Sequence, residues 1–172
     1  MTNISIHKMK KLTLAVTLLM SCIGFSQKDL SKLLKQQNTE SIPYISIETL
    51  VNKSDDFILL DSREQKEYDT SHLKNARFVG YDHFDLQQTT KQLPNKQQTI
   101  VVYCSLGIRS EDTAEKLLAA GYTNVFNLYG GIFEWKNQGL SVYDSNNLET
   151  EKVHTFSKAW SKWLLKGEKI YD

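Results

Sequence analysis

Short apolar runs alternate with segments of helical periodicity along most of the chain. The runs are rich in β-branched or aromatic residues and are short enough to be buried strands. They cover residues 43–46, 57–60, 100–103 and 125–128, with a weaker run at 77–79. Strands that alternate with helices form α/β domains, and continuous apolar strands are typical of parallel sheets. The pattern therefore predicts an α/β domain with a mainly parallel five-stranded sheet flanked by helices.

Helices are expected after several of these strands. Residues 47–51 follow Ser46, whose side chain suits a helix N-cap. Residues 111–120 carry apolar side chains at helical spacing and stop before Gly121, a residue type that often ends helices. Another helix is expected over 130–135, and a helical turn over 82–86.

The first 26 residues have the order of a secretory signal peptide. Lysines within 8–11 precede an apolar stretch over 12–20, and residues 24–26 resemble a small-x-small cleavage site. The stretch is short for a membrane span. We therefore expect an exported, periplasmic protein that begins near Gln27. Two alternatives stay open: an uncleaved signal anchor, and a lipid anchor at Cys22.

Composition narrows the classes of function. Lysine and arginine number 21 against 20 acidic residues, a net charge of +1. No basic surface for a nucleic-acid partner is therefore expected. The chain has two cysteines, Cys22 and Cys104, and signal cleavage would leave Cys104 alone. A lone thiol in an oxidising compartment indicates either a reactive cysteine or a shielded one.

Cys104 is the candidate for chemistry, because it lies between the strand at 100–103 and the helix at 111–120. The free N–H groups and the dipole of a helix N-terminus favour an anion, and a thiolate is an anion. Gly107 lets loop amides turn inward, and Arg109 adds a positive charge. The alternative is an inert buried cysteine at the end of a strand.

Residues 104–110 (CSLGIRS) resemble the active-site loop of the single-domain rhodaneses, a family of sulfurtransferases. Residues 61–76 and 128–135 are similar to two further signatures of that family. One departure is Asn75, where the family usually has glycine; asparagine also tolerates left-handed backbone angles. The resemblance covers about residues 43–142 and implies the rhodanese-like fold.

The resemblance implies an enzyme of the thiosulfate sulfurtransferase type. In that family the cysteine carries a persulfide, so Cys104 would be the nucleophile. It would take sulfur from a small donor such as thiosulfate and pass it to a thiol, to cyanide or to a protein acceptor. No metal or organic cofactor is implied. The residues expected to bind the donor are Ser105, Leu106, Gly107, Ile108, Arg109, Ser110 and Arg63.

Three further functions stay open. Phosphatases of related fold place five residues between Cys and Arg, whereas four separate Cys104 from Arg109. The shorter loop suits one sulfur atom better than a tetrahedral phosphate, which argues against a phosphatase or arsenate reductase. The remaining two functions are those of a noncatalytic rhodanese-like binding module and of a persulfide carrier for a partner protein.

The polar residues of the 61–76 signature also fit structural roles. Arg63 and Glu67 are four residues apart, which suits an ion pair as well as donor binding by Arg63. Asp61 is expected to bind backbone amides near the active loop. The resemblance makes His72 a structural turn residue and not the base of a Cys–His dyad.

The C-terminal segment lies beyond the resemblance. Val153, Phe156, Trp160, Trp163 and Leu164 fall at helical spacing. This pattern predicts an amphipathic helix, docked on the domain or binding a membrane surface or a partner. The expected organisation is a signal peptide over 1–26, a leader over 27–42, a rhodanese domain over 43–142 and a helical extension over 143–172.

Overall fold

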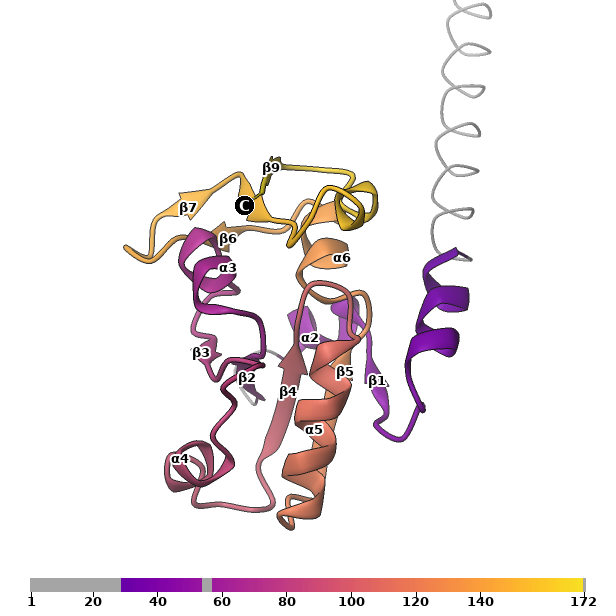
Figure 1. Cartoon of the computed structure of the whole chain (residues 1–172). Coiled ribbons are helices and arrows are strands. Elements are labelled where there is room, and N and C mark those ends of the chain that lie inside the picture. The colour runs from indigo at the N-terminus through magenta and orange to yellow at the C-terminus, as the bar shows by residue number, and fades with distance from the viewer. Residues whose placement is uncertain (1–28, 54–56, 172) are drawn as a thin grey trace, which may run out of the picture. The chain divides into compact units, whose positions relative to one another are not determined.

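The computed structural model describes residues 29–53 and 57–171 (Figure 1). The predicted signal peptide, its cleavage site and Cys22 lie outside the described residues. The chain divides into two compact units, Met1–Gln36 and Gln37–Asp172. The described part of the first unit is helical. Within the described ranges, no helix is both long enough and apolar enough to cross a membrane.

The second unit is built on a five-stranded parallel sheet with the strand order β1-β5-β4-β2-β3. The predicted α/β fold with a parallel sheet is therefore confirmed. In the register of β2 and β4, Asp61 lies beside Tyr103, so both strands end at the same edge. The strands are β1 (Tyr44–Ile45), β2 (Phe57–Asp61), β3 (Arg77–Phe78), β4 (Thr99–Tyr103) and β5 (Asn124–Leu128).

The helices begin and end largely where local sequence signals place them. Ser46 caps α2, accepting a backbone N–H of its first turn, as predicted. α5 ends shortly before Gly121, whose φ of 90° suits glycine. In the range 82–86, where a helical turn was predicted, the Phe84 amide closes a turn onto the Tyr81 carbonyl, and Asp85 then caps a helix that starts at Leu86. The helices are α2 (Ile47–Asn52), α3 (Gln65–Thr70), α4 (Leu86–Lys91), α5 (Arg109–Ala119) and α6 (Gly131–Asn137).

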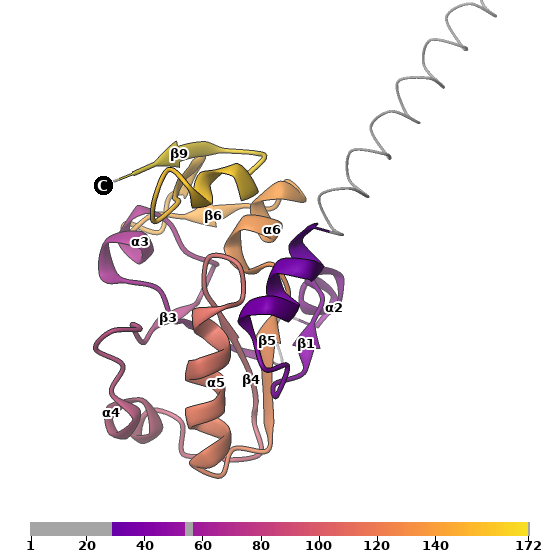
Figure 2. The same ribbon diagram turned by 45° about the vertical axis from the view of Figure 1, so that its right-hand side comes forward.

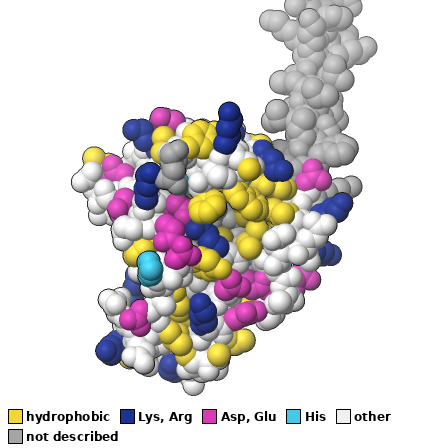
Figure 3. Space-filling view, in the orientation of Figure 1, with side chains coloured by type: hydrophobic (Ala, Val, Ile, Leu, Met, Phe, Trp, Pro, Cys, Tyr) yellow, Lys and Arg dark blue, Asp and Glu magenta, His cyan; other side chains and the backbone are white. Residues whose placement is uncertain are grey.

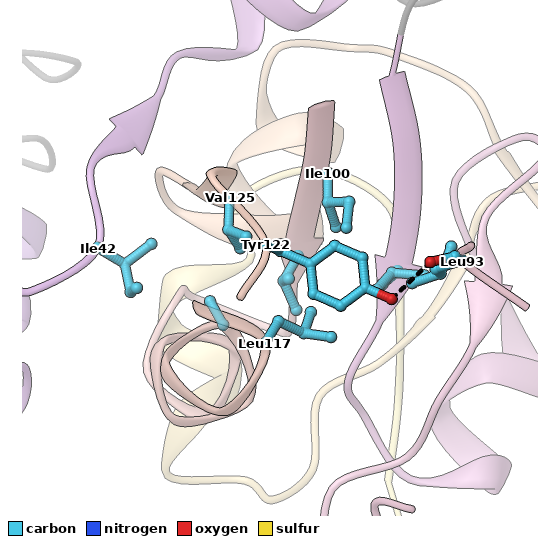
Figure 4. Close-up of a cluster of buried hydrophobic side chains, with 9 residues drawn as sticks. Ile42, Leu93, Ile100, Leu117, Tyr122 and Val125 are labelled. Atoms are coloured by element: carbon cyan, nitrogen blue, oxygen red, sulfur yellow. Dashed lines mark hydrogen bonds between the residues drawn. The ribbon is translucent and has the colours of Figure 1, made fainter. Parts of the chain in front are cut away.

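One face of the sheet packs against α5, which lies in front of β4 and β5 (Figure 1). Alternate residues of a strand point to opposite faces, so Ile100 and Val102 of β4 share this side. They join a buried cluster with Leu117 of α5 and Tyr122 (Figure 4). The Tyr122 hydroxyl donates to the Leu93 carbonyl at 2.6 Å, which satisfies a polar atom inside an apolar cluster. This cluster anchors α5 and thereby the loop that precedes it.

The C-terminal segment is not the predicted amphipathic helix. The strands β6 (Val142–Tyr143) and β7 (Glu149–Thr150) pair antiparallel, and β8 (Lys152–His154) pairs in parallel with β9 (Glu168–Ile170). Between β8 and β9 only Trp160–Trp163 are helical, as the 3-10 helix η2. This pairing between distant residues supplies the backbone hydrogen bonds that a helix would otherwise supply, so the tertiary contact overrides the local periodicity.

The C-terminal segment lies at the end of the sheet where β4 leads into α5, in both views (Figures 1 and 2). Its strand β8 packs against α3. Val153 and Leu164 are fully buried, so they attach the segment to the domain. Phe156 and Trp160 are not buried in this way. The apolar residues of the segment thus fall into two groups: Val153 and Leu164 pack into the domain, whereas Phe156 and Trp160 stay partly exposed.

Gly131 at the start of α6 lies directly against the loop after β4. The amides of Ile132 and Phe133 donate to the carbonyls of Cys104 and Ser105, at 3.0 and 3.1 Å. Gly131 has a φ of 54°, and a Cβ there would collide with the Cys104 carbonyl oxygen. Only glycine allows this approach.

We expect Gly131→Ala to lower the free energy of unfolding by about 3 kcal/mol, because it adds overpacking to left-handed backbone strain. Gly121→Ala is the matched control: its φ is also positive, but its Cβ would meet nothing within 4 Å. It should lose only the strain, about 1–2 kcal/mol. Urea denaturation measures both losses, and equal losses would contradict the close approach.

Candidate functional site

Cys104 lies between the end of β4 and the start of α5, where it lines a cavity of about 240 Å³. It is 2% exposed and forms no disulfide. The helix N-terminus expected after it is present, since α5 begins at Arg109. The cavity thus brings several predicted residues together with two from the C-terminal segment. Its lining residues are Cys104, Ser105, Leu106, Ile108, Arg109, Phe156 and Trp160.

The sulfur of Cys104 has two polar neighbours from its own loop. The Gly107 amide donates to Sγ at 3.1 Å, and the Ser110 hydroxyl oxygen lies 3.5 Å from Sγ. Gly107 has a φ of 103°, which a residue with a Cβ rarely adopts. This backbone conformation turns the amide inward, toward the atom where negative charge would develop.

Asn127 of β5 supports the loop from the other side, and the sequence analysis did not identify it. Its Nδ2 donates to the Gly107 carbonyl at 2.8 Å, which leaves Oδ1 to accept from the Ser110 hydroxyl at 2.7 Å. The Gly107 carbonyl also accepts from Asn38 Nδ2 at 2.8 Å. Because the Ser110 proton is directed to Asn127, the Gly107 amide is the better donor to the sulfur of Cys104. The signal in the sequence was a polar residue within an apolar strand.

Arg109 was expected to add a free positive charge near the sulfur. In the structure this charge is paired with a carboxylate. Its Nη1 and Nη2 donate to the two carboxylate oxygens of Glu67, both at 2.7 Å. Ser105 joins the pair, because its hydroxyl donates to Glu67 and accepts from Arg109. Glu67 lies in α3, where it also completes a capping box with Glu64. The ion pair therefore joins α3 to the Cys104 loop and balances the charge of Arg109.

The pair changes the pKa of both partners. Burial favours the protonated form of Glu67, but hydrogen bonds from Arg109 hold the pKa of the Glu67 carboxyl below its usual value of 4.5. Burial likewise opposes the charge of Arg109, yet the hydrogen bonds to Glu67 and the charge of the nearby Cys104 sulfur raise the pKa of Arg109. Both groups are thus held in their ionised forms.

Arg63 does not line the cavity, so its prediction as a donor-binding residue is wrong. Its side chain is fully buried and donates to both carboxylate oxygens of Asp61, at 2.6 Å for the shortest bond, and to the Ser71 carbonyl. It does not form the alternative ion pair with Glu67, whose carboxylate binds Arg109. Asp61 also accepts the backbone N–H of Arg63. The guanidinium of Arg63 turns back toward β2 because Asp61, two residues before Arg63, lies at the buried end of that strand.

His72 has the contacts of a structural residue. Its ring stacks on Tyr68 with centroids 4.0 Å apart, and its Nδ1 lies 3.1 Å from the Tyr68 carbonyl oxygen. It is outside the lining of the Cys104 cavity.

Asn75 stands where the family usually has glycine. Its φ is 62°, so it adopts the left-handed conformation that glycine adopts easily. In the ranges 29–53 and 57–171, no group of three or more His, Cys, Asp or Glu side chains is arranged to hold a metal ion.

One wall of the cavity comes from the C-terminal segment, which the sequence analysis did not connect with the site. Phe156 and Trp160 contribute this wall. The Arg109 guanidinium carbon lies 5.3 Å from the Phe156 ring centroid and 5.9 Å from that of Tyr81. Figure 3 shows hydrophobic side chains gathered between the C-terminal segment and the start of α5. The cavity is therefore mainly apolar, with its one charged lining residue already paired.

The Glu67–Arg109 pair predicts a pH-dependent stability. A carboxyl with a lowered folded-state pKa stabilises the fold above its unfolded value, and the effect is lost as the pH falls through the folded value. We expect Glu67→Gln to lower the free energy of unfolding by about 2 kcal/mol at neutral pH. The deficit should shrink as the pH falls from about 6 to about 3.

Chemical denaturation at a series of pH values measures this deficit. The exposed Glu168 is the matched position, and Glu168→Gln should change stability little at any of these pH values. A Glu67→Gln deficit that stays constant down to the lowest pH would show that the carboxylate charge is not what stabilises the pair.

Comparison with known proteins gives the context of this site. Residues 46–138 match the family model of the rhodanese-like domain. Two curated relatives are named tRNA uridine(34) hydroxylase, from Photorhabdus laumondii and Yersinia enterocolitica. Each is 37% identical, over 94 and 99 residues, and each match covers 51% of this chain and 27% of the relative. The chain thus spans about a quarter of the length of these relatives.

Solved structures show the same fold. A rhodanese-related protein from Thermoplasma volcanium is 26% identical with a TM-score of 0.52, over 58% of this chain and 96% of that chain. A thiosulfate sulfurtransferase from Pseudomonas aeruginosa is 19% identical with a TM-score of 0.58, over 81% of this chain and 26% of that chain. At this identity the second likeness concerns the fold alone. With more than half of its residues matched by the family model, the chain belongs to the rhodanese-like domain family.

Proposed function

We propose that this protein is a sulfurtransferase that moves a sulfane sulfur from a small donor to a thiophilic acceptor through a persulfide on Cys104. The observation that carries this proposal is the position of Cys104 in the lining of a cavity, with the Gly107 amide donating to its sulfur at 3.1 Å. An inert cysteine would need neither the positive φ of Gly107 nor the support of that loop by Asn127.

In the first step the Cys104 thiolate attacks the outer sulfur of the donor. A new S–S bond forms on Cys104, and the S–S bond of the donor breaks. The electron pair leaves with the remainder of the donor, as sulfite if the donor is thiosulfate. The negative charge then lies on the outer sulfur of the Cys104 persulfide. No proton, metal or external oxidant takes part.

In the second step the acceptor attacks that outer sulfur. A bond forms between the sulfur and the acceptor, the S–S bond on Cys104 breaks, and the thiolate of Cys104 is restored. The Gly107 amide stabilises the anionic leaving sulfur, as an oxyanion-hole donor does. The Glu67–Arg109 pair holds the loop in the geometry that both steps require. Cyanide or a small thiol is a suitable laboratory acceptor, and a protein thiol is a further candidate.

Phosphate-ester hydrolysis fits this site less well. A phosphate would need donors around three oxygens, whereas the guanidinium of Arg109 is already engaged by both carboxylate oxygens of Glu67. Four residues between Cys104 and Arg109 also make a short loop. Hydroxylation of tRNA, the activity that the names of the curated relatives give, belongs to proteins of which this chain spans about a quarter. A persulfide carrier for a partner protein would use the same first step on Cys104.

Export of the protein is part of the proposal, and it rests on the sequence. Residues 1–26 combine basic, apolar and small residues in the order of a signal peptide. A periplasmic location would place Cys104 in an oxidising compartment, where a shielded pocket protects a reactive thiol. Lipid attachment at Cys22 is the alternative route.

The first prediction of this proposal concerns the persulfide. Full-length protein incubated with a sulfane-sulfur donor should gain the mass of one sulfur atom, located on Cys104 by peptide mass spectrometry. Cys104→Ser should gain none and should lose turnover. Cys22→Ser is the matched control, because it removes the other cysteine of the sequence and should load normally. Turnover that survives in Cys104→Ser would overturn the proposal.

The second prediction concerns processing. N-terminal sequencing of protein recovered from the cell envelope should begin near Gln27, because the small residues before it suit cleavage. Replacing the apolar stretch 12–20 by polar residues should keep the protein in the cytosol. Recovery of an intact N-terminus embedded in the membrane would identify an anchor, and a lipid on Cys22 would identify the alternative route.

A further inference from the structure

The wall of the Cys104 cavity that comes from the C-terminal segment lies outside the family match. The match ends at residue 138, whereas Phe156 and Trp160 belong to the segment that follows β8. The family model therefore describes only part of the lining of this cavity. The part outside the match is aromatic and shares the lining with the loop that carries Cys104.

Phe156 is held in an unfavourable backbone conformation. Its φ is 62°, in the left-handed region that bulky side chains avoid, and 49% of the residue is exposed. Its N–H donates to His154 Nδ1 at 3.1 Å. The neighbouring Thr155 is fixed by two bonds, from its N–H and its hydroxyl, to the Ile170 carbonyl. Strain of this kind persists where the surroundings impose it, and it clusters at functional sites.

Burial does not explain this placement of the ring. An aromatic side chain that is about half exposed gains only part of the hydrophobic stabilisation of a core residue. The strained backbone instead directs the Phe156 ring to the edge of the cavity, next to the guanidinium of Arg109. A ring in this position is available to contact a molecule that enters the cavity.

The charge of the cavity also limits what it binds well. Arg109 is its one charged lining residue, and Glu67 engages both of its terminal nitrogens. A small dianion such as thiosulfate therefore finds the Gly107 amide but no uncommitted cation among the described residues of the lining. An apolar cavity of about 150 Å³ takes up benzene, so the cavity above Cys104, at about 240 Å³, has room for one ring.

We propose that Phe156 and Trp160 bind an apolar group of the sulfur donor, and that the preferred donor is a monoanionic organic sulfane-sulfur compound and not thiosulfate. This inference rests on the proposed sulfur transfer by Cys104. With benzenethiosulfonate as the probe, the Cys104 thiolate bonds to the outer sulfur and the S–S bond of the probe breaks. The electron pair leaves with benzenesulfinate, so atoms and charge balance without a co-reactant. The phenyl ring occupies the space against Phe156 and Trp160.

The experiment compares kcat/KM for benzenethiosulfonate and thiosulfate in the full chain. Each rate is divided by the rate of the same donor with free cysteine, which removes intrinsic reactivity. The wild type should then favour benzenethiosulfonate by about tenfold or more, which is about 1.4 kcal/mol and within what two aromatic contacts supply. Phe156→Gly and Trp160→Leu should each reduce this preference about threefold or more, mainly through KM.

Phe156→Gly separates a binding role from a structural one. Glycine accepts the positive φ, so removing the ring should not lower the melting temperature even as the preference falls. Tyr171→Ala is the matched control, because Tyr171 is an exposed aromatic residue of the same segment that does not line the cavity. It should leave the preference unchanged. Calorimetry of benzenesulfinate with Cys104→Ser should show binding that Phe156→Gly weakens, with no turnover involved.

Two failures can be told apart. If both donors load Cys104 but the corrected preference is absent, or is unchanged in Phe156→Gly and Trp160→Leu, the proposed sulfur transfer stands and the aromatic wall does not select the donor. A wall that contacts a protein acceptor instead would give this same result. If neither donor places sulfur on Cys104, the proposed function fails, and this inference fails with it.

Discussion

A loop that turns its amides toward a sulfur must turn its carbonyls away, and those carbonyls need donors from elsewhere. In this protein the carbonyls of Cys104 and Ser105 accept the first amides of α6, and the Gly107 carbonyl accepts Asn38 and Asn127. Buried polar groups left without partners cost free energy, so these bonds are a condition for the loop to exist. The conformation around Cys104 therefore depends on β5, on α6 and on the segment before β1, all distant in sequence.

A second constraint is the charge of Arg109. A partly buried arginine needs a partner, and Glu67 of α3 binds both of its terminal nitrogens while also capping its own helix. The pair stabilises the loop and leaves the cavity with little net charge. The aromatic wall formed by Phe156 and Trp160 is consistent with that balance. A polarisable sulfur attached to an apolar group suits such a surface better than a small dianion does.

Sequence reasoning worked where an interaction is local. Ser46 caps α2 by accepting the N–H of Thr49, three residues ahead, Gly121 follows the end of α5, and the apolar strand 100–103 is buried on both faces. It failed where two local partners competed. The i,i+4 spacing suggested that Arg63 binds Glu67, but Asp61 at the buried end of β2 accepts from Nε and Nη2 of Arg63. Glu67 instead binds an arginine 42 residues away, a distance that no local spacing rule reaches.

Local sequence patterns predicted the five strands of the parallel sheet, several of the helices and the candidate cysteine, because hydrophobic periodicity, capping residues and the Cys104–Ser110 motif are all encoded within a few residues. The tertiary structure alone decided which partners complete the site. Asn127 reaches the Cys104 loop only because β5 lies beside β4 in the sheet. Phe156 and Trp160 reach the cavity only because β8 pairs with β9 and bends the segment that local periodicity predicted as a helix. Contacts between distant segments depend on packing, which acts through the whole fold and not through neighbours in the chain.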